Sequence, residues 1–256
     1  MVHATPLAAW SASLLHREKN VRIEAALELG KLADPAAVPV LVSRLGVEPD
    51  FFVGENVVWA LVRIGAPSVL PVIAVFQRGA PAARVHAAHA LGKLGDARAV
   101  PALLAGLRDD DAAVVQKVVC SLGTLRDVRA LPPLVAMLAE GGGSGELRGT
   151  LSDAVAAFGV AAVPALASLL DALRGDRAGV AVRVEVVEIL GQLGVEAAVA
   201  PLAAALEDVD WEVRFAAVNA LRRVDDAGVV HLLAPLLRDG HPHVSALAAR
   251  VVRELT

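Results

Sequence analysis

The side chains best suited to catalysis are a single cysteine with a histidine and an aspartate at matching positions of a sequence pattern. Cys120 is the only cysteine among 256 residues, and His89 and Asp153 lie 31 residues before it and 33 residues after it. A cysteine becomes nucleophilic when a neighbouring base or cation favours its thiolate, and His89 or Lys117 would serve. Alternatively, Cys120 is a small hydrophobic side chain in a helix rich in Ala and Val.

Two pairs of side chains have a spacing that would suit a metal ion. His86 and His89 are three residues apart, as are Glu185 and Glu188, which places each pair on one face of a helix. The pairs lie three repeats apart, however, so roughly 30 Å separates them if packed helices are ~10 Å apart. One ion would bridge them only if the chain curled tightly, and we therefore predict no metal site and no cofactor.

These side chains belong to a repeat that extends along the whole chain. The repeat is clearest at residues 84–104, RVHAAHALGKLGDARAVPALL. Its last apolar residue before the loop recurs every 30 to 35 residues, at Leu32, Ile64, Leu94, Leu125, Phe158, Leu193, Val224 and Leu255. The two longest gaps contain residues 141–145 and 174–179, whose compositions are typical of loops. Such a period indicates stacked copies of one structural unit.

Each repeat predicts two helices. The first begins near a proline, because a first helical turn tolerates the missing N–H. These prolines are Pro39, Pro71, Pro101, Pro132 and Pro164. The second begins after Asp50, Asp111 or Asp210, which can cap its free N–H groups. We expect the second helices near residues 20–32, 53–64, 83–94, 112–125, 146–158, 181–193, 211–224 and 243–255.

The second helix divides its positions between packing and a free face. Counted from the valine of a Val-Arg dipeptide as position 0, apolar residues fall at positions 0, 4, 5, 8 and 11, which is helical spacing. Position 1 is arginine in five repeats, at Arg22, Arg84, Arg148, Arg183 and Arg214. A row that binds anions is one interpretation. We predict instead that it pairs with Asp50, Asp111 and Asp210, since half-buried arginine favours bidentate carboxylate partners.

Positions 3, 6 and 10 are then expected to lie on the free face. The side chains predicted to bind a ligand or partner are Glu55, Trp59, Arg63, His86, His89, Lys117, Asp153, Glu185, Glu188 and Asn219. A solvated helix face would also be polar, which is the plainer interpretation. Tryptophan, histidine and cysteine are less usual on such a face, and Trp59 offers a flat apolar surface with one N–H donor.

The repeat resembles the HEAT repeats of the phycobilin-lyase type, in which a Val-Arg, Ala-Ala, Ala-Leu-Gly helix is followed by an Ala-Val-Pro-x-Leu helix. The resemblance covers about Thr5 to Thr256. It implies an all-α fold, an α-solenoid of about eight helix pairs in a single domain over residues 1–256. The Val-Arg helices would be the inner, concave side and the proline-led helices the outer, convex side.

The same resemblance leaves the function open, because fold alone does not choose it. Proteins with such repeats include bilin lyases, deoxyhypusine hydroxylase, a DNA-alkylation repair glycosylase and adaptors without chemistry. Deoxyhypusine hydroxylase uses His-Glu dipeptides, and this sequence has none. A repair enzyme would need a basic inner face, whereas the side chains predicted above to bind a ligand or partner are mixed to acidic in charge.

Composition excludes further classes. Net charge is −4, so we expect no nucleic-acid partner, which would require clustered basic residues. No stretch approaches the ~18–20 unbroken apolar residues of a membrane span, and the first residues do not resemble a signal peptide. We therefore expect a cytoplasmic protein without a membrane partner.

The sequence thus favours a scaffold or adaptor that binds a protein or peptide in the concave groove. The alternative is an enzyme or small-molecule binder, lyase-like and suited to a planar ligand, with its site in the middle of that groove. Its candidate catalytic residues are Cys120, His89 and Asp153.

Overall fold

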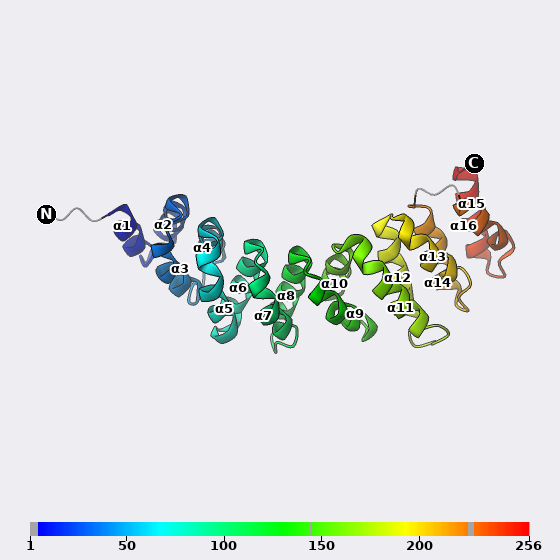
Figure 1. The fold of residues 1–256 in the computed structure, drawn as a ribbon, viewed down its shortest axis with the longest axis horizontal. Helices are drawn as coiled ribbons and strands as arrows, with labels where there is room; N and C mark the ends of the chain where they lie inside the picture. Colours follow the sequence, from blue (N-terminus) through cyan, green and yellow to red (C-terminus); the bar gives the residue numbers. More distant parts are fainter. Residues whose placement is uncertain (1–4, 144, 225–227, 256) are drawn as a thin grey trace. The chain divides into compact units, whose positions relative to one another are not determined.

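The computed structural model describes residues 5–143, 145–224 and 228–255. Within these residues every regular element is a helix, so the predicted all-α solenoid is confirmed (Figure 1). The chain forms two compact units, Met1–Asp127 and Val128–Thr256, and each is described by itself. The single domain over residues 1–256 stays a prediction.

The N-terminal unit contains two layers of helices. Its helices are α1 (Pro6–Ser13), α2 (Lys19–Leu32), α3 (Val38–Leu45), α4 (Phe51–Ile64), α5 (Val69–Arg78), α6 (Pro81–Leu94), α7 (Val100–Gly106) and α8 (Ala112–Leu125). The inner layer is α2, α4, α6 and α8, each packed on the next, and α3, α5 and α7 pack on one another as the outer layer. Helix α1 packs on α2.

The C-terminal unit repeats this arrangement. Its helices are α9 (Leu131–Ala139), α10 (Glu146–Ala156), α11 (Val163–Ala172), α12 (Val180–Leu193), α13 (Val199–Ala205), α14 (Trp211–Leu221), α15 (Val229–Leu233) and α16 (Pro242–Leu255). The inner layer is α10, α12, α14 and α16, and α9, α11 and α13 pack as outer helices. All eight inner helices lie at the predicted places, and α14 ends at Leu221 rather than near residue 224.

The inner helices approach closely because position 9 of the repeat is often glycine. A Cβ on Gly92 would lie 2.9 Å from Ser121 Cβ, and a Cβ on Gly191 would lie 2.6 Å from Ala220 Cβ. The Ala-Leu-Gly motif therefore sets the spacing of neighbouring inner helices. The paired alanines at positions 4 and 5 serve the same packing, since Ala87 and the residue after it are fully buried.

Aspartate caps two of the three inner helices for which we predicted it. Asp50 accepts hydrogen bonds from the N–H groups of Phe52 and Val53, and Asp111 caps α8 in the same way. Asp210 is an exception, because its side chain makes no cap hydrogen bond. Its Oδ2 instead accepts from Arg183 Nη2 at 2.6 Å.

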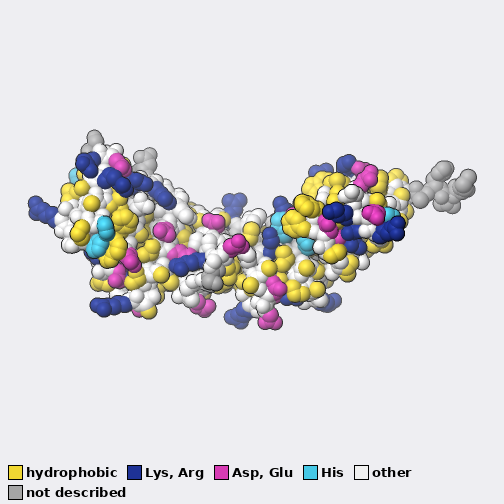
Figure 2. Space-filling model, turned by 180° about the vertical axis from the view of Figure 1, so that it is seen from behind, with side chains coloured by type: hydrophobic (Ala, Val, Ile, Leu, Met, Phe, Trp, Pro, Cys, Tyr) yellow, Lys and Arg dark blue, Asp and Glu magenta, His cyan; other side chains and the backbone are white. Residues whose placement is uncertain are grey.

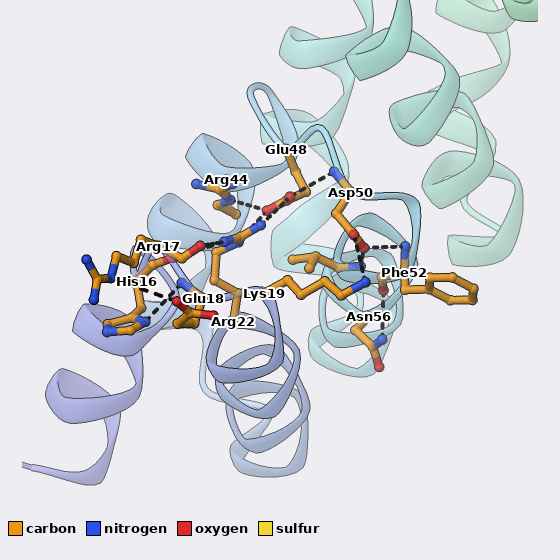
Figure 3. Close-up of polar contacts among 11 residues, drawn as sticks. His16, Arg17, Glu18, Lys19, Arg22, Arg44, Glu48, Asp50, Phe52 and Asn56 are labelled. Atoms are coloured by element: carbon orange, nitrogen blue, oxygen red, sulfur yellow. Dashed lines mark hydrogen bonds and ion pairs between the residues drawn. The ribbon is translucent and has the colours of Figure 1, made fainter.

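The arginine row pairs with carboxylates, as predicted, but mostly not with the predicted ones. Arg22 donates to both carboxylate oxygens of Glu48 at 2.9 Å and to the carbonyls of His16 and Arg17 (Figure 3). Glu48 also accepts from Arg44 and from the backbone N–H of Asp50. The partner is thus the acidic residue two places before the helix cap, where it also accepts the capping residue's N–H.

Three further arginines follow this rule. Arg84 pairs with Asp109, Arg183 with Asp208 and Arg214 with Asp239, at 2.7 to 2.8 Å. These ion pairs link the start of an inner helix to the loop that leads into the next one. Arg148 differs, because it binds Glu185 of the neighbouring inner helix at 2.7 Å. The row is therefore structural, and each of its five guanidinium groups is paired with a carboxylate.

Among the described residues, no single helix is long and apolar enough to cross a membrane; two bent pairs, α4 with α5 and α10 with α11, reach that length and composition only jointly.

Candidate functional site

Three adjacent inner helices of the N-terminal unit bring together a carboxylate and two imidazoles. Glu55 of α4 places Oε2 3.3 Å from Nε2 of His89 and Oε1 3.9 Å from Nδ1 of His86, both on α6. Lys117 of α8 is close enough to act on both histidines electrostatically. Four of the predicted site residues therefore do form one cluster, which we call the Glu55 cluster.

The local sequence explains how His86 reaches this position. Repeat two has Gly54 where five other repeats have arginine, and a Cβ there would lie 2.6 Å from His86 Cε1. The missing side chain leaves the space that the imidazole fills, beside the ring of Phe51 at 6.3 Å between centroids. His86 is consequently only 9% exposed. Our expectation that position 3 lies on the free face is wrong here, because His86 lies between adjacent inner helices.

Both histidines are held in the neutral form. Burial lowers the pKa of His86 and of His89, the charge of Glu55 opposes this, and the charge of Lys117 adds to it. The net direction is downward, so both imidazoles are mainly uncharged near pH 7. His89 Nε2 lies 3.3 Å from Glu55 Oε2, and this contact links α6 to α4.

Cys120 is exposed on α8. His89 contacts Glu55 of α4, on the side of α6 away from α8, and among the described residues it makes no hydrogen bond or ion pair with Cys120. Asp153 is exposed on α10 of the C-terminal unit. The catalytic assignment of these three residues stays a prediction. No group of three or more His, Cys, Asp or Glu side chains in the described part of the chain is placed to hold a metal ion.

In the C-terminal unit, Glu185 is committed to helix packing. It is 7% exposed, and its oxygens accept from Arg148 Nε at 2.7 Å and Ser152 Oγ at 2.5 Å. The prediction that Glu185 is available to a ligand is therefore wrong, for the same reason as at His86. Glu188, one turn further on, is exposed and lines a hollow of about 420 Å³ between α10 and α12, together with Asp153.

A second hollow, of about 360 Å³, lies between α12, α14 and α16. Its lining comprises Val184, Glu188, Trp211, Glu212, Phe215, Ala216, Asn219 and His243. Trp211 and Phe215 are each 37% exposed. On the left of Figure 2, in the C-terminal unit, histidine lies beside hydrophobic side chains on the molecular surface. We call the hollow lined by these eight residues the α14 hollow.

Glu188 and Asn219 of this hollow were predicted from the sequence, whereas its aromatic walls were not. Trp211, Phe215 and His243 lie at positions −2, 2 and −1 of their repeats, whereas the predicted site residues other than Glu55 lie at positions 3, 6 and 10. The available signal was scarcity, because the chain has only 3 Trp and 5 Phe. Trp211 and Phe215, two of these eight aromatic residues, lie about one turn apart at the start of one helix, and this pairing is the signal that the sequence offers.

The N-terminal unit also exposes aromatic side chains on an inner helix. Phe51 and Phe52 are 63% and 64% exposed at the start of α4, and their rings meet edge to face at 5.6 Å. Trp59, 39% exposed, covers Gly30 of α2, and Arg63 follows it one turn later, also exposed. This helix therefore presents an apolar surface beside the Glu55 cluster.

Comparison with known proteins identifies the repeat. The family profile described as HEAT repeats matches residues 7–76, 71–154 and 166–253. The sequence matches none of the curated proteins with which it was compared.

The chain is also similar to three solved structures. Human deoxyhypusine hydroxylase in complex with glycerol is 21% identical with a TM-score of 0.44, over 97% of this chain and 95% of that one. An engineered protein is 19% identical with a TM-score of 0.43, over 98% and 79%. The complex of CpcE and CpcF of phycocyanin lyase from Nostoc sp. is 22% identical with a TM-score of 0.38, over 99% and 96%.

Proposed function

The chain belongs to the HEAT-repeat family, and from this premise we propose that it is a non-enzymatic scaffold that binds a protein or peptide on its inner helices. One observation carries the proposal. Five of the eight aromatic residues are 37–64% exposed, and all five lie on inner helices α4 and α14. They are Phe51, Phe52, Trp59, Trp211 and Phe215.

This distribution has a physical meaning because exposed aromatic side chains are costly in water. Burying one removes a large apolar area from solvent, and aromatic residues contribute strongly to binding at protein interfaces. The remaining Phe76 and Phe158 are buried, and Trp10 is partly so. Since the outer helices expose no comparable ring among the described residues, binding is directed to the inner layer.

The alternative of a small-molecule binder draws on a different observation, the α14 hollow. Its volume of about 360 Å³ falls in the range of ligand pockets. We favour the scaffold because the α4 aromatics have no such enclosure and because Cys120 has no recorded partner base among the described residues. A compact ligand held only by the C-terminal unit would support the alternative.

Selection from a displayed library of random peptides on the immobilised full chain tests the scaffold proposal. Two double variants, Phe51→Ala with Phe52→Ala and Trp211→Ala with Phe215→Ala, should each weaken the peptides that contact that helix by about tenfold or more, which corresponds to ~1.4 kcal/mol. Leu70→Ala and Val160→Ala are matched controls, since both side chains are exposed but lie outside the inner helices, at 62% and 60%.

The affinities of the control variants should equal that of the natural chain. Peptides that bind all variants equally well would show that the exposed aromatics do not make the binding surface. Turnover of a small molecule that depends on His89 or Cys120 would replace the scaffold with the enzyme alternative.

A further inference from the structure

The α14 hollow combines apolar rings with free carboxylates. Trp211 stacks on His241 with 4.0 Å between ring centroids and 9° between planes, so the pair forms a rigid wall. Phe215 meets Trp211 edge to face at 6.4 Å, and His243 lies 5.9 Å from Trp211. Because these rings support one another, the wall exists before a ligand arrives.

The charge at this hollow is one-sided. Glu188 of α12 and Glu212 of α14 line it, and none of its eight lining residues is Lys or Arg. Among the described residues, no ion pair is recorded for either carboxylate. The contrast with Glu185 is instructive, because that carboxylate lies one turn earlier on α12 and is fully occupied by Arg148 and Ser152.

Such a lining has a defined complement. An alkyl stem packs on Trp and Phe rings, a cation is attracted to the negative face of an aromatic ring, and carboxylates stabilise the same charge. The Asn219 amide oxygen adds a neutral acceptor. An anion would meet two carboxylates, and a purely apolar group would leave them without a partner.

We propose that the α14 hollow binds the side chain of a lysine or arginine presented by a peptide partner. The inference rests on the proposed scaffold function and names the chemistry of its partner in the C-terminal unit. The volume of about 360 Å³ accommodates one long side chain with part of its backbone. The wall of Trp211 and Phe215 contacts the methylene groups, while Glu188 and Glu212 contact the charged end.

The test uses the indole N–H signal of Trp211 in the ¹⁵N-labelled full chain, identified by its absence in Trp211→Phe. The probes are blocked pentapeptides, acetyl-Ala-Ala-X-Ala-Ala-amide, with Lys, Arg, norleucine or Glu as X. Lys and Arg peptides should give saturable shifts at millimolar concentration. The norleucine and Glu peptides should bind several-fold more weakly, and added salt should weaken the Lys peptide.

Carboxylate variants make the assignment specific. Glu188→Gln and Glu212→Gln should each lower affinity for the Lys peptide about threefold, as expected for an exposed ion pair. Glu196→Gln, at an exposed carboxylate outside the hollow, should leave it unchanged. Equal affinity for Lys and norleucine peptides, or no saturable shift with any peptide, overturns the proposal. If butylammonium binds as tightly as the Lys peptide, the proposal that a peptide presents the cation is refuted.

The outcome is separable from that of the scaffold proposal. Library peptides that depend on Trp211 and Phe215 but carry no basic residue would refute the basic side chain and leave the scaffold standing. The scaffold proposal is tested separately by the affinity of library peptides for the Phe51→Ala with Phe52→Ala variant, and these two residues lie outside the α14 hollow.

Discussion

His86 fills the space that a side chain at Gly54 would occupy, with its Cε1 only 2.6 Å from where the added Cβ would lie. We therefore expect Gly54→Ala to destabilise the N-terminal unit by about 1–3 kcal/mol, as overpacking does. Urea unfolding followed by circular dichroism measures this. The loss should shrink in a His86→Ala background. Gly149→Ala is the control, because α10 is open there and alanine favours helix; an equal loss at both glycines would contradict the packing account.

Arg183 is the most deeply buried arginine, fully enclosed and bound to Asp208, Asp210 and two backbone carbonyls. Arg183→Leu should cost about 3–5 kcal/mol, because it leaves a buried carboxylate without its charge partner. Arg174→Leu removes an exposed pair with Asp171 and should cost at most about 1 kcal/mol. Similar unfolding midpoints for the two variants would show that burial does not govern this row.

Glu48 gives the N-terminal unit a sensitivity to acid. Burial raises its pKa, but hydrogen bonds from Arg22 and Arg44 outweigh this and bring it from 4.5 to about 2. A lowered carboxylate pKa stabilises the fold above the unfolded value, and this contribution is lost as pH falls from about 4.5 towards 2. Glu48→Gln should lower stability at pH 7 and flatten its decline in that window. An unchanged slope would refute the assignment.

The histidines of the Glu55 cluster act in a separate pH window. Their pKa values are lowered from 6.5, so the unfolded chain binds protons first and stability should fall as pH drops below 6.5. The unfolding midpoint should be lower at pH 5.5 than at pH 7.5. The double variant His86→Gln with His89→Gln should reduce this difference. His231→Gln, on an exposed residue of α15, should leave the difference intact. A reduction there as well would point to a general charge effect.

Helical periodicity and helix capping predicted most of the fold. The inner helices were foreseeable because Ala, Val and Leu recur at helical spacing, and the caps at Asp50 and Asp111 follow from local chemistry. At Asp210 the predicted cap is wrong and the predicted pairing with the arginine row is confirmed, because the side chain binds Arg183, 27 residues away in the chain, instead of its own helix. Local rules do not show such competition.

The candidate site was less predictable because it depends on how neighbouring helices are rotated. Glu55, His86 and His89 meet because position 3 of α6 turns towards α4, where Gly54 leaves room. The spacing of residues along one helix does not determine how that helix is rotated about its axis relative to its neighbour. Trp211 was missed for the same reason, since its wall is completed by His241 and His243 of the following repeat.

The arginine pairs also determine where this chain is modular. A repeat exchange that separates an inner helix from the outer helix after it would leave the arginine of that inner helix without its carboxylate, which lies beyond the outer helix. The arginines affected in this way are Arg22, Arg84, Arg183 and Arg214. After α4 and α8 no arginine would be stranded, since position 1 is Gly54 in one and Val115 in the other. A break after α4 would, however, separate Gly54 and Glu55 from His86 and His89 of α6. Natural or engineered gain and loss of repeats should therefore be tolerated best after α8 and resisted elsewhere.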